Sequence, residues 1–252
     1  VEVSATAHYY YAAYLVTEAA KMLGKKSDEN KYRTLANHIR NAFNSKFFDA
    51  NTKQYANGSQ FCNAVAIFMG IVEPQYKQAV MENLKADICK HGNRLTTGDV
   101  GNRYLFQALA LNNENELMYL MHNHTDAPGY GFQIKYGVTT LTEQWDPRKG
   151  ASWNHFMMGQ IDEWFFRSLA GIEPVQQGFK EFNIQPQPVG DLEWVKANHE
   201  TLYGNISVYW KRKDDSFYLS VEVPTNTKAN VILPDGSKKT VGSGKYDFEC
   251  KL

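Results

Sequence analysis

The segment from Gly137 to His155, which reads GVTTLTEQWDPRKGASWNH, contains the residue types that a sugar-cleaving pocket requires. A carboxylate, Glu143, stands two positions before Trp145, and a short loop separates both from Asn154 and His155. A flat aromatic ring can stack on the apolar face of a sugar, and a carboxylate can accept a proton from water. The spacing alone also permits a loop glutamate, a core tryptophan and a helix N-terminus.

Four other carboxylates have simpler interpretations. Asp99 follows Thr97-Gly98 before a helical pattern, which predicts an N-cap. Asp126 and Asp146 stand next to turn-forming residues, and Glu163 lies within an amphipathic helical pattern. We therefore expect an N-cap at Asp99, turn residues at Asp126 and Asp146, and a solvated or ion-paired Glu163. None of the four is expected to be catalytic.

The sequence gives no sign of a metal or a cofactor. The cysteines at positions 62, 89 and 250 are far apart and match neither a metal motif nor a disulfide framework, so we expect free, buried thiols. None of the seven histidines shows metal-ligand spacing, and His122 and His124 are expected to be solvated.

The charge and the hydropathy of the chain give no support for a nucleic-acid or membrane partner. Lys plus Arg and Asp plus Glu number 27 each among 252 residues, so nothing favours nucleic acid or an anionic membrane surface. No apolar run reaches the roughly 18 residues of a membrane span.

The chain begins inside a helical pattern, with no initiating Met and no signal-peptide charge pattern, so we expect a piece of a longer protein. The sequence does not indicate the cellular compartment.

Residues 5–172 follow a helical period. Helices are expected over about 5–24, 27–43, 61–72, 74–89, 102–113 and 114–124, with a further one starting at Ser152. Ser27 is expected to cap the second. One face of the first should carry Tyr10, Tyr14, Thr17 and Met22.

Beyond residue 178 the period becomes two, with turns at 214–215 and 234–236, which predicts a small antiparallel β module. Trp210 alternates with Ile206 and Val208 and is expected in its core, whereas Trp194 and Tyr203 remain available to a ligand. We place the domain boundary between residues 176 and 177, giving domains 1–176 and 177–252.

Four blocks together resemble the bacterial α-L-rhamnosidases of glycoside hydrolase family 78. They are LTTGDVGNRYLFQAL at 95–109, PGYGFQIKYGVTTLTEQWD at 128–146, SWNHFMMGQIDEWFF at 152–166 and HETLYGNISVYW at 199–210. The resemblance implies a mainly α fold: the second part of an (α/α)6 barrel, followed by a C-terminal β-sandwich. It also implies that the first half of the barrel lies upstream.

The resemblance implies roles for individual residues. Glu143 matches the general base of an inverting hydrolysis that releases terminal α-L-rhamnose, and the general acid is expected in the upstream half. His155 matches a position that contacts rhamnose, and Trp145 and Asn154 lie in the same signatures. The chain departs from the family at Thr142, where Trp is common, at Trp153, and in the short loop over 147–151.

Two other functions remain open from the sequence. One is an (α/α)6 glycosidase with another sugar specificity, such as a trehalase-like or glucoamylase-like enzyme. The other is a carbohydrate-binding role for the β module. In the leading hypothesis the partner is a rhamnose-containing glycoside, and the chain alone is expected to be inactive and prone to form homo-oligomers because its upstream half is missing.

Overall fold

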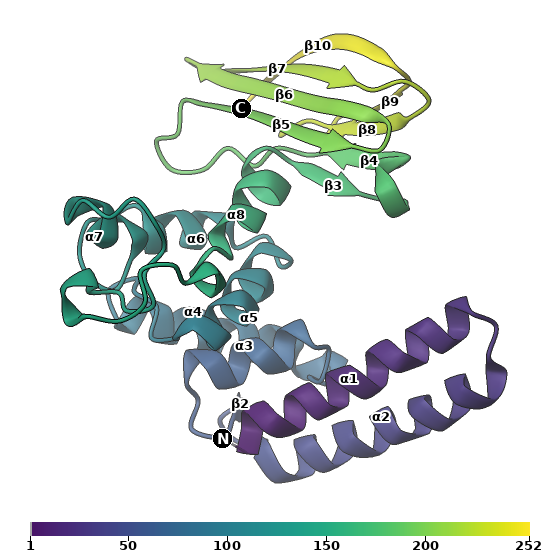
Figure 1. Cartoon of the computed structure of the whole chain (residues 1–252), viewed down its shortest axis with the longest axis vertical. Helices are drawn as coiled ribbons and strands as arrows, with labels where there is room; N and C mark the ends of the chain where they lie inside the picture. Colours follow the sequence, from purple (N-terminus) through teal and green to yellow (C-terminus); the bar gives the residue numbers. More distant parts are fainter. Residues whose placement is uncertain (1) are drawn as a thin grey trace. The chain divides into compact units, whose positions relative to one another are not determined.

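The computed structural model describes residues 2–252, which form two compact units (Figure 1). The helical unit comprises residues up to Asn112 together with Met121–Met158. The β unit comprises Asn113–Leu120 and Gly159–Leu252. The helices are α1 Glu2–Met22, α2 Lys26–Phe47, α3 Gln60–Phe68, α4 Lys77–Lys90, α5 Asp99–Ala110, α6 Asn115–His122, α7 Tyr130–Lys135 and α8 Ile161–Trp164. Helix α6 thus crosses from one unit to the other.

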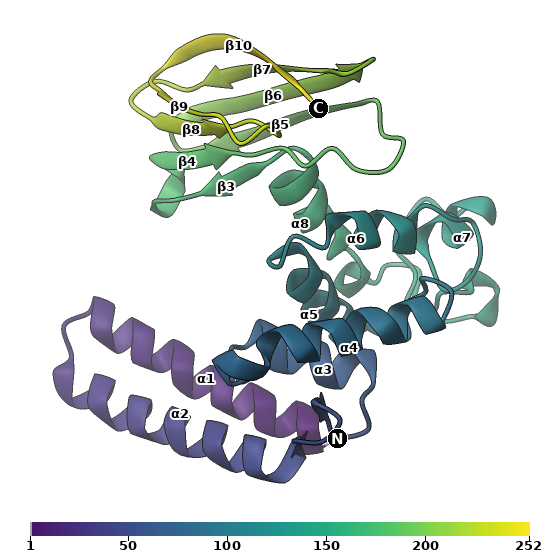
Figure 2. The same ribbon diagram turned by 180° about the vertical axis from the view of Figure 1, so that it is seen from behind.

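Helices α1 and α2 form an antiparallel hairpin (Figures 1 and 2). Small residues at three- and four-residue spacing let α1 approach its partner, and the buried set is Ala7, Tyr10, Ala13, Thr17 and Ala20. Two of the four residues expected on one face of this helix, Tyr14 and Met22, are 41% and 80% exposed, so that face is only partly buried. Gly24, at φ +68°, ends α1 in the left-handed conformation. The expected cap at Ser27 was also wrong: Lys25 occupies the N-cap position and makes no side-chain cap.

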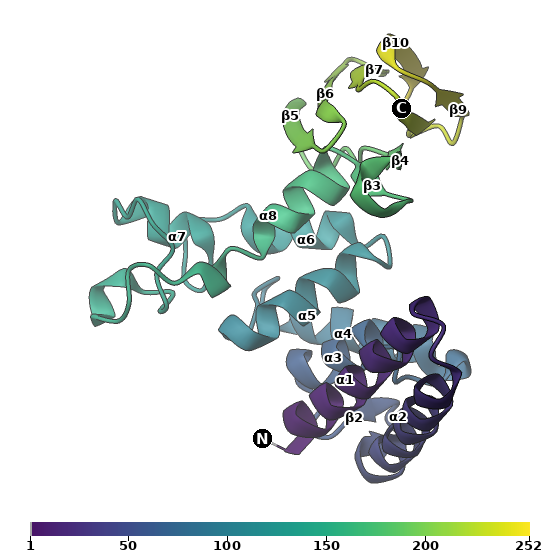
Figure 3. The ribbon, with the colours of Figure 1, turned by 45° about the vertical axis from the view of Figure 1, so that its right-hand side comes forward.

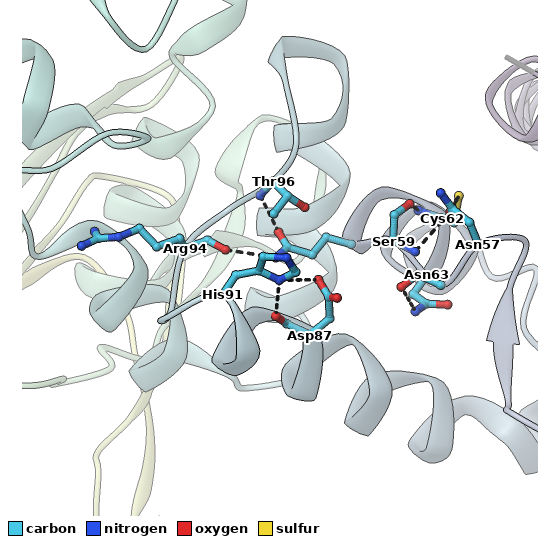
Figure 4. Close-up of polar contacts among 10 residues, drawn as sticks. Asn57, Ser59, Cys62, Asn63, Asp87, His91, Arg94 and Thr96 are labelled. Atoms are coloured by element: carbon cyan, nitrogen blue, oxygen red, sulfur yellow. Dashed lines mark hydrogen bonds and ion pairs between the residues drawn. The ribbon is translucent and has the colours of Figure 1, made fainter.

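Helix α3 is buried almost all round, and it packs against α4 and α5. Ser59 caps it by accepting from the backbone N–H of Cys62. The fully buried Gln60 donates to the carbonyl oxygen of Arg94 at 3.0 Å and accepts from the N–H of Thr96 at 2.8 Å. Figure 4 shows Ser59, Arg94 and Thr96 with these contacts. The loop that leads into α5 is therefore tied to the buried start of α3.

The β unit contains two four-stranded sheets, whose strands Figure 3 shows from near their ends. One has the order β10-β7-β6-β5 and the other β3-β4-β8-β9, with every pairing antiparallel except the parallel pair β4–β8. The strands are β3 Ile172–Pro174, β4 Glu181–Ile184, β5 Trp194–Thr201, β6 Gly204–Lys213, β7 Ser216–Val223, β8 Lys228–Ile232, β9 Lys238–Val241 and β10 Gly244–Lys251. A two-stranded ribbon, β1 Phe48–Asp49 and β2 Gln54–Tyr55, belongs to the helical unit.

An apolar core lies within the β unit and draws residues from both sheets. Trp210 is fully buried there, as predicted, and its indole Nε1 donates to the carbonyl oxygen of Leu169 at 2.7 Å. Trp194 is exposed on β5. The two predicted turns join β6 to β7 and β8 to β9.

A mainly helical part followed by a β-sandwich is thus confirmed. The helix expected from Ser152 was wrong, because a 3-10 turn over Phe156–Met158 comes first, α8 begins only at Ile161, and a π-helical turn over Phe165–Leu169 continues it. Helix α7 was not expected. Across residues 2–252, no helix has the length and apolarity that crossing a membrane would require.

Candidate active site

The signature segment forms a loop whose two ends are held together by hydrogen bonds. The N–H of Glu143 donates to the carbonyl oxygen of Ser152, and the N–H of His155 donates to that of Leu141, both at 2.9 Å. The hydroxyl of Thr140 also donates to the carbonyl oxygen of Trp153. These contacts define a loop neck, residues 140–143 paired with 152–155, and they place Glu143 at the mouth of the loop.

The loop beyond the neck is ordered by its own short-range contacts. Asp146 caps a 3-10 turn over Pro147–Lys149 by accepting from the N–H of Arg148 at 3.1 Å, and Gly150 closes the turn at φ +72°. Asp146 also forms an ion pair with Arg148 at 2.8 Å, which lowers the pKa of that carboxyl. The predicted turn role of Asp146 is confirmed.

The Glu143 side chain is exposed and is fixed at one oxygen. Its Oε2 accepts from the N–H of Ser152 at 3.2 Å. Within residues 2–252, no basic side chain forms an ion pair with it. The other carboxylate oxygen is therefore available to a water molecule or a substrate.

Buried side chains behind Glu143 hold both of its neighbours. Gln133 on α7 donates from Nε2 to the carbonyl oxygens of Thr142 and Gln144, each at 3.3 Å. The Thr142 hydroxyl donates to the same Gln144 oxygen at 2.7 Å. Gln133 and Thr142 are both buried, so the backbone on either side of the carboxylate is supported from the interior.

Trp145 packs into an aromatic wall. Its ring meets Tyr130 edge to face, with centroids 5.1 Å apart, and the Tyr130 hydroxyl donates to the carbonyl oxygen of Met158 at 2.5 Å. The indole Nε1 is buried, and among the described residues it has no hydrogen-bond partner. The residue is half-buried, so its contact with a sugar stays a prediction.

His155 is paired with a carboxylate that the sequence did not connect to it. Its ring Nε2 lies 3.3 Å from Oδ2 of Asp99, which is the first residue of α5. The predicted N-cap role of Asp99 was wrong, because Gly98 holds the N-cap position. His155 itself lies in non-helical backbone, and Asn154 is exposed and caps no helix, its N–H meeting Ser152 Oγ at 3.3 Å.

A hollow of about 670 Å³ adjoins Asp99 in the helical unit. It is lined by residues at the start of α1 and in the loop before α5, with His8 and Phe61 among them. His8 is held between the carbonyl oxygen of Ser4, 2.7 Å from Nδ1, and the hydroxyl of Tyr104, 2.6 Å from Nε2. The hollow thus has a carboxylate, an imidazole and an aromatic ring on its walls.

Two further carboxylates are already engaged in ion pairs. Asp126 pairs with Arg94 at 3.0 Å and Glu163 with Arg167 at 2.8 Å. Arg167 also contacts Glu173. The ion-paired interpretation of Glu163 is confirmed, and Asp126 lies in the irregular segment before α7 as predicted.

The histidine and cysteine predictions were partly wrong. The ring nitrogens of His122 are buried beside Phe106 and Tyr130, and burial lowers the pKa of His122 to about 3. Burial also lowers the pKa of His124, which lies 2.8 Å from the carbonyl oxygen of Met121. All three cysteines are free, but Cys89 is exposed. In the described part of the chain, no group of three or more His, Cys, Asp and Glu side chains is placed to hold a metal ion.

The sequence missed Asp99, Tyr130 and Gln133 as parts of this site. Each lies inside a quoted family block, which is the signal that could have drawn attention to them. The sequence gives no sign that Asp99 contacts His155, because the two residues are 56 positions apart.

Comparisons with known proteins agree on one family. The family model of the bacterial alpha-L-rhamnosidase six-hairpin glycosidase domain matches residues 1–169, and that of the bacterial alpha-L-rhamnosidase C-terminal domain matches 171–247. An alpha-L-rhamnosidase of Formosa agariphila is 29% identical over 252 residues, covering 96% of this chain and 27% of the relative.

Solved structures give the same result. The alpha-L-rhamnosidase of Dictyoglumus thermophilum has a TM-score of 0.91 at 30% identity, covering 98% of this chain and 31% of its own. That of Streptomyces avermitilis, complexed with L-rhamnose, has a TM-score of 0.92 at 29% identity, covering 99% of this chain and 27% of its own. The chain therefore spans about a quarter to a third of the length of these relatives.

Proposed function

Because this chain belongs to the bacterial α-L-rhamnosidase family, we propose that it forms part of an inverting glycoside hydrolase that releases terminal α-L-rhamnose, with Glu143 as the general base. The observation that carries the proposal is the exposed Glu143 carboxylate at the loop neck, held at Oε2 and open at its other oxygen. The relative from Streptomyces avermitilis complexed with L-rhamnose supports the choice of sugar.

Glu143 suits the role of a base for physical reasons. A carboxylate that accepts only one backbone hydrogen bond keeps lone pairs for water, and it is oriented without being neutralised by a nearby cation. In the reaction, a water molecule bound to Glu143 attacks the anomeric carbon from the face opposite the leaving group and gives its proton to Glu143. The bond to the leaving oxygen breaks, and that oxygen takes a proton from a second carboxyl group.

We propose that this second group, the general acid, lies outside the 252 residues. An inverting pair needs carboxyl groups about 6.5–9.5 Å apart, with room between them for the water. Asp126 and Asp146 are each paired with an arginine, and Asp99 is engaged with His155. The relatives are about three to four times longer than this chain, and they have room for a further catalytic carboxyl.

The remaining site residues are proposed to bind the sugar. His155 would hydrogen-bond to a hydroxyl of rhamnose, and the exposed amide of Asn154 would offer a further donor and acceptor. Trp145 would support the pocket through the aromatic wall that it forms with Tyr130. The substrate is a glycoside with a terminal rhamnose.

The test is a Glu143→Gln substitution in a hydrolysis-competent protein that contains this chain. Glutamine keeps an oxygen acceptor for the N–H of Ser152 but cannot take a proton, so folding should be intact and turnover should fall about 10²–10⁴-fold. Glu163→Gln is the control, because that carboxylate is engaged with Arg167 and should be dispensable for the chemistry. Near-normal turnover in Glu143→Gln, or an equal loss in both variants, would refute the assignment.

A further inference from the structure

We infer that Asp99 is a positioning residue that fixes the tautomer and the orientation of the His155 ring, so that Nε2 carries the proton and Nδ1 presents its lone pair. This inference deepens the proposed function and rests on it for the identity of the ligand, a sugar hydroxyl. The observation is the 3.3 Å contact between His155 Nε2 and Asp99 Oδ2.

Asp99 is held rigidly enough for this role. It begins α5, and its Oδ1 accepts from the N–H of Val100 at 2.8 Å. The loop before it is tied to the interior by the buried Gln60, and the buried Thr97 donates to Asn102 Oδ1 at 2.7 Å. Oδ2 is therefore directed by a fixed helix start rather than by a mobile surface loop.

The backbone of His155 is fixed from the other side. Its N–H donates to the carbonyl oxygen of Leu141 in the loop neck. Among residues 2–252, Asp99 is the one side chain that hydrogen-bonds to the His155 ring. One fixed backbone and one fixed carboxylate together leave the ring little freedom to turn.

The chemistry of the pair decides the tautomer. An ionised carboxylate is only an acceptor, so the imidazole nitrogen that faces it must be the donor. A neutral imidazole has one donor and one acceptor nitrogen, which leaves Nδ1 as the acceptor. A sugar hydroxyl can donate to that lone pair. With Nε2 facing Asp99, the Nδ1 atom of His155 is therefore expected to bind a hydroxyl group that donates a hydrogen bond.

The test reads the tautomer directly. Nitrogen-15 NMR of a histidine-labelled, hydrolysis-competent protein that contains this chain, at about pH 8 and so above the usual imidazole pKa of about 6.5, distinguishes the two neutral forms. In the wild type, Nε2 of His155 should be protonated and Nδ1 should be bare. His155→Gln identifies the resonances.

Asp99→Ala and Asp99→Asn should both give a mixture of tautomers at His155. Alanine removes the acceptor, and the asparagine amide can face the ring with either its oxygen or its NH₂ group. Asparagine keeps an acceptor for the N–H of Val100, so it protects the start of α5. Asp126→Asn is the matched control, since that aspartate pairs with Arg94, and it should leave the His155 tautomer unchanged.

Titration with L-rhamnose separates this inference from the proposed function. We expect L-rhamnose to shift the Nδ1 resonance of His155, with affinity about 3- to 10-fold weaker in Asp99→Ala. This loss of affinity lies at the low end of the range for losing a charge-assisted hydrogen bond, because the Asp99 side chain is 38% exposed to solvent. An unchanged tautomer in both Asp99 variants would overturn the positioning role. A tautomer that changes as expected, with no response to L-rhamnose in the wild type, would support the positioning role and count against the proposed sugar contact.

Discussion

Replacing Trp210 with phenylalanine should destabilise the β unit by about 2–4 kcal/mol. The Trp210 side chain is fully buried in the core between the sheets, and its Nε1 donates to the carbonyl oxygen of Leu169 at 2.7 Å. Phenylalanine cannot make that bond, and a buried carbonyl left without its donor costs about 1–3 kcal/mol. The missing ring volume adds about 1 kcal/mol, well below the roughly 3–5 kcal/mol of a complete Trp→Ala truncation.

Urea unfolding measures this loss. With a slope of about 2 kcal/mol/M, a loss of 2–4 kcal/mol moves the midpoint down by about 1–2 M. Hydrogen exchange of the β6 amides assigns the loss to the β unit, because their protection should fall with the stability of the core.

Trp194→Phe is the matched control. Trp194 lies on the neighbouring strand β5, but it is 59% exposed, so its replacement should stay within about 0.5 kcal/mol of the wild type. A change below 0.5 kcal/mol in Trp210→Phe, or equal losses in the two variants, would show that burial and the bond to Leu169 do not stabilise this unit as argued.

Three further predictions concern the helical unit. The His122 pKa of about 3 means that the unfolded chain binds more protons than the folded chain between pH 3 and the ordinary value of 6.5. The unfolding free energy should therefore decrease as the pH is lowered from 6.5 to 3, by up to about 1.4 kcal/mol per pH unit. His122→Phe should flatten that pH dependence in denaturation curves, and an unchanged slope would contradict it. His155→Ala should weaken rhamnoside binding or hydrolysis without unfolding the protein; collapsed stability with normal kinetics in the surviving fraction would favour a structural role. The chain alone should leave an aryl α-L-rhamnoside intact and should associate, since α1 and the turn after it expose Tyr9, Leu15, Met22 and Leu23. An active, monodisperse monomer in light scattering would contradict both expectations.

Periodicity predicted the elements whose burial follows from local pattern. Helix α3 is apolar except for Gln60 and Asn63 and is mostly buried. Trp210 lies on the same buried face of β6 as Ile206 and Val208. The first helix shows the limit of this approach, because it is apolar on several faces. Its small alanines, rather than the larger Tyr14 and Met22, mark the side that packs against α2.

The sequence named candidate site residues that are neighbours in the chain but not those that meet only in the fold. Glu143, Trp145, Asn154 and His155 could be proposed because they share one signature segment, and their roles stay predictions. The expected helix from Ser152 failed because backbone bonds of the loop neck, such as that from His155 to Leu141, compete with helical bonds. Asp99 was misinterpreted because a carboxylate at a helix start has a sufficient local explanation, and its contact with His155 is purely tertiary.

The loop neck has a consequence for how such a site can diversify. The hydrogen bonds that hold Glu143 are made by residues that flank the segment 144–151, not by residues within it. Gln133 supports the same backbone from the interior. Insertions in an exposed loop whose ends are already joined add little closure entropy, about 0.6 kcal/mol for each doubling of length. The segment 146–151 is therefore a place where the chain can gain or lose residues and reshape the surface beside Glu143, while the proposed general base keeps its position. Under the proposed function, substrate range could then change without loss of catalytic power.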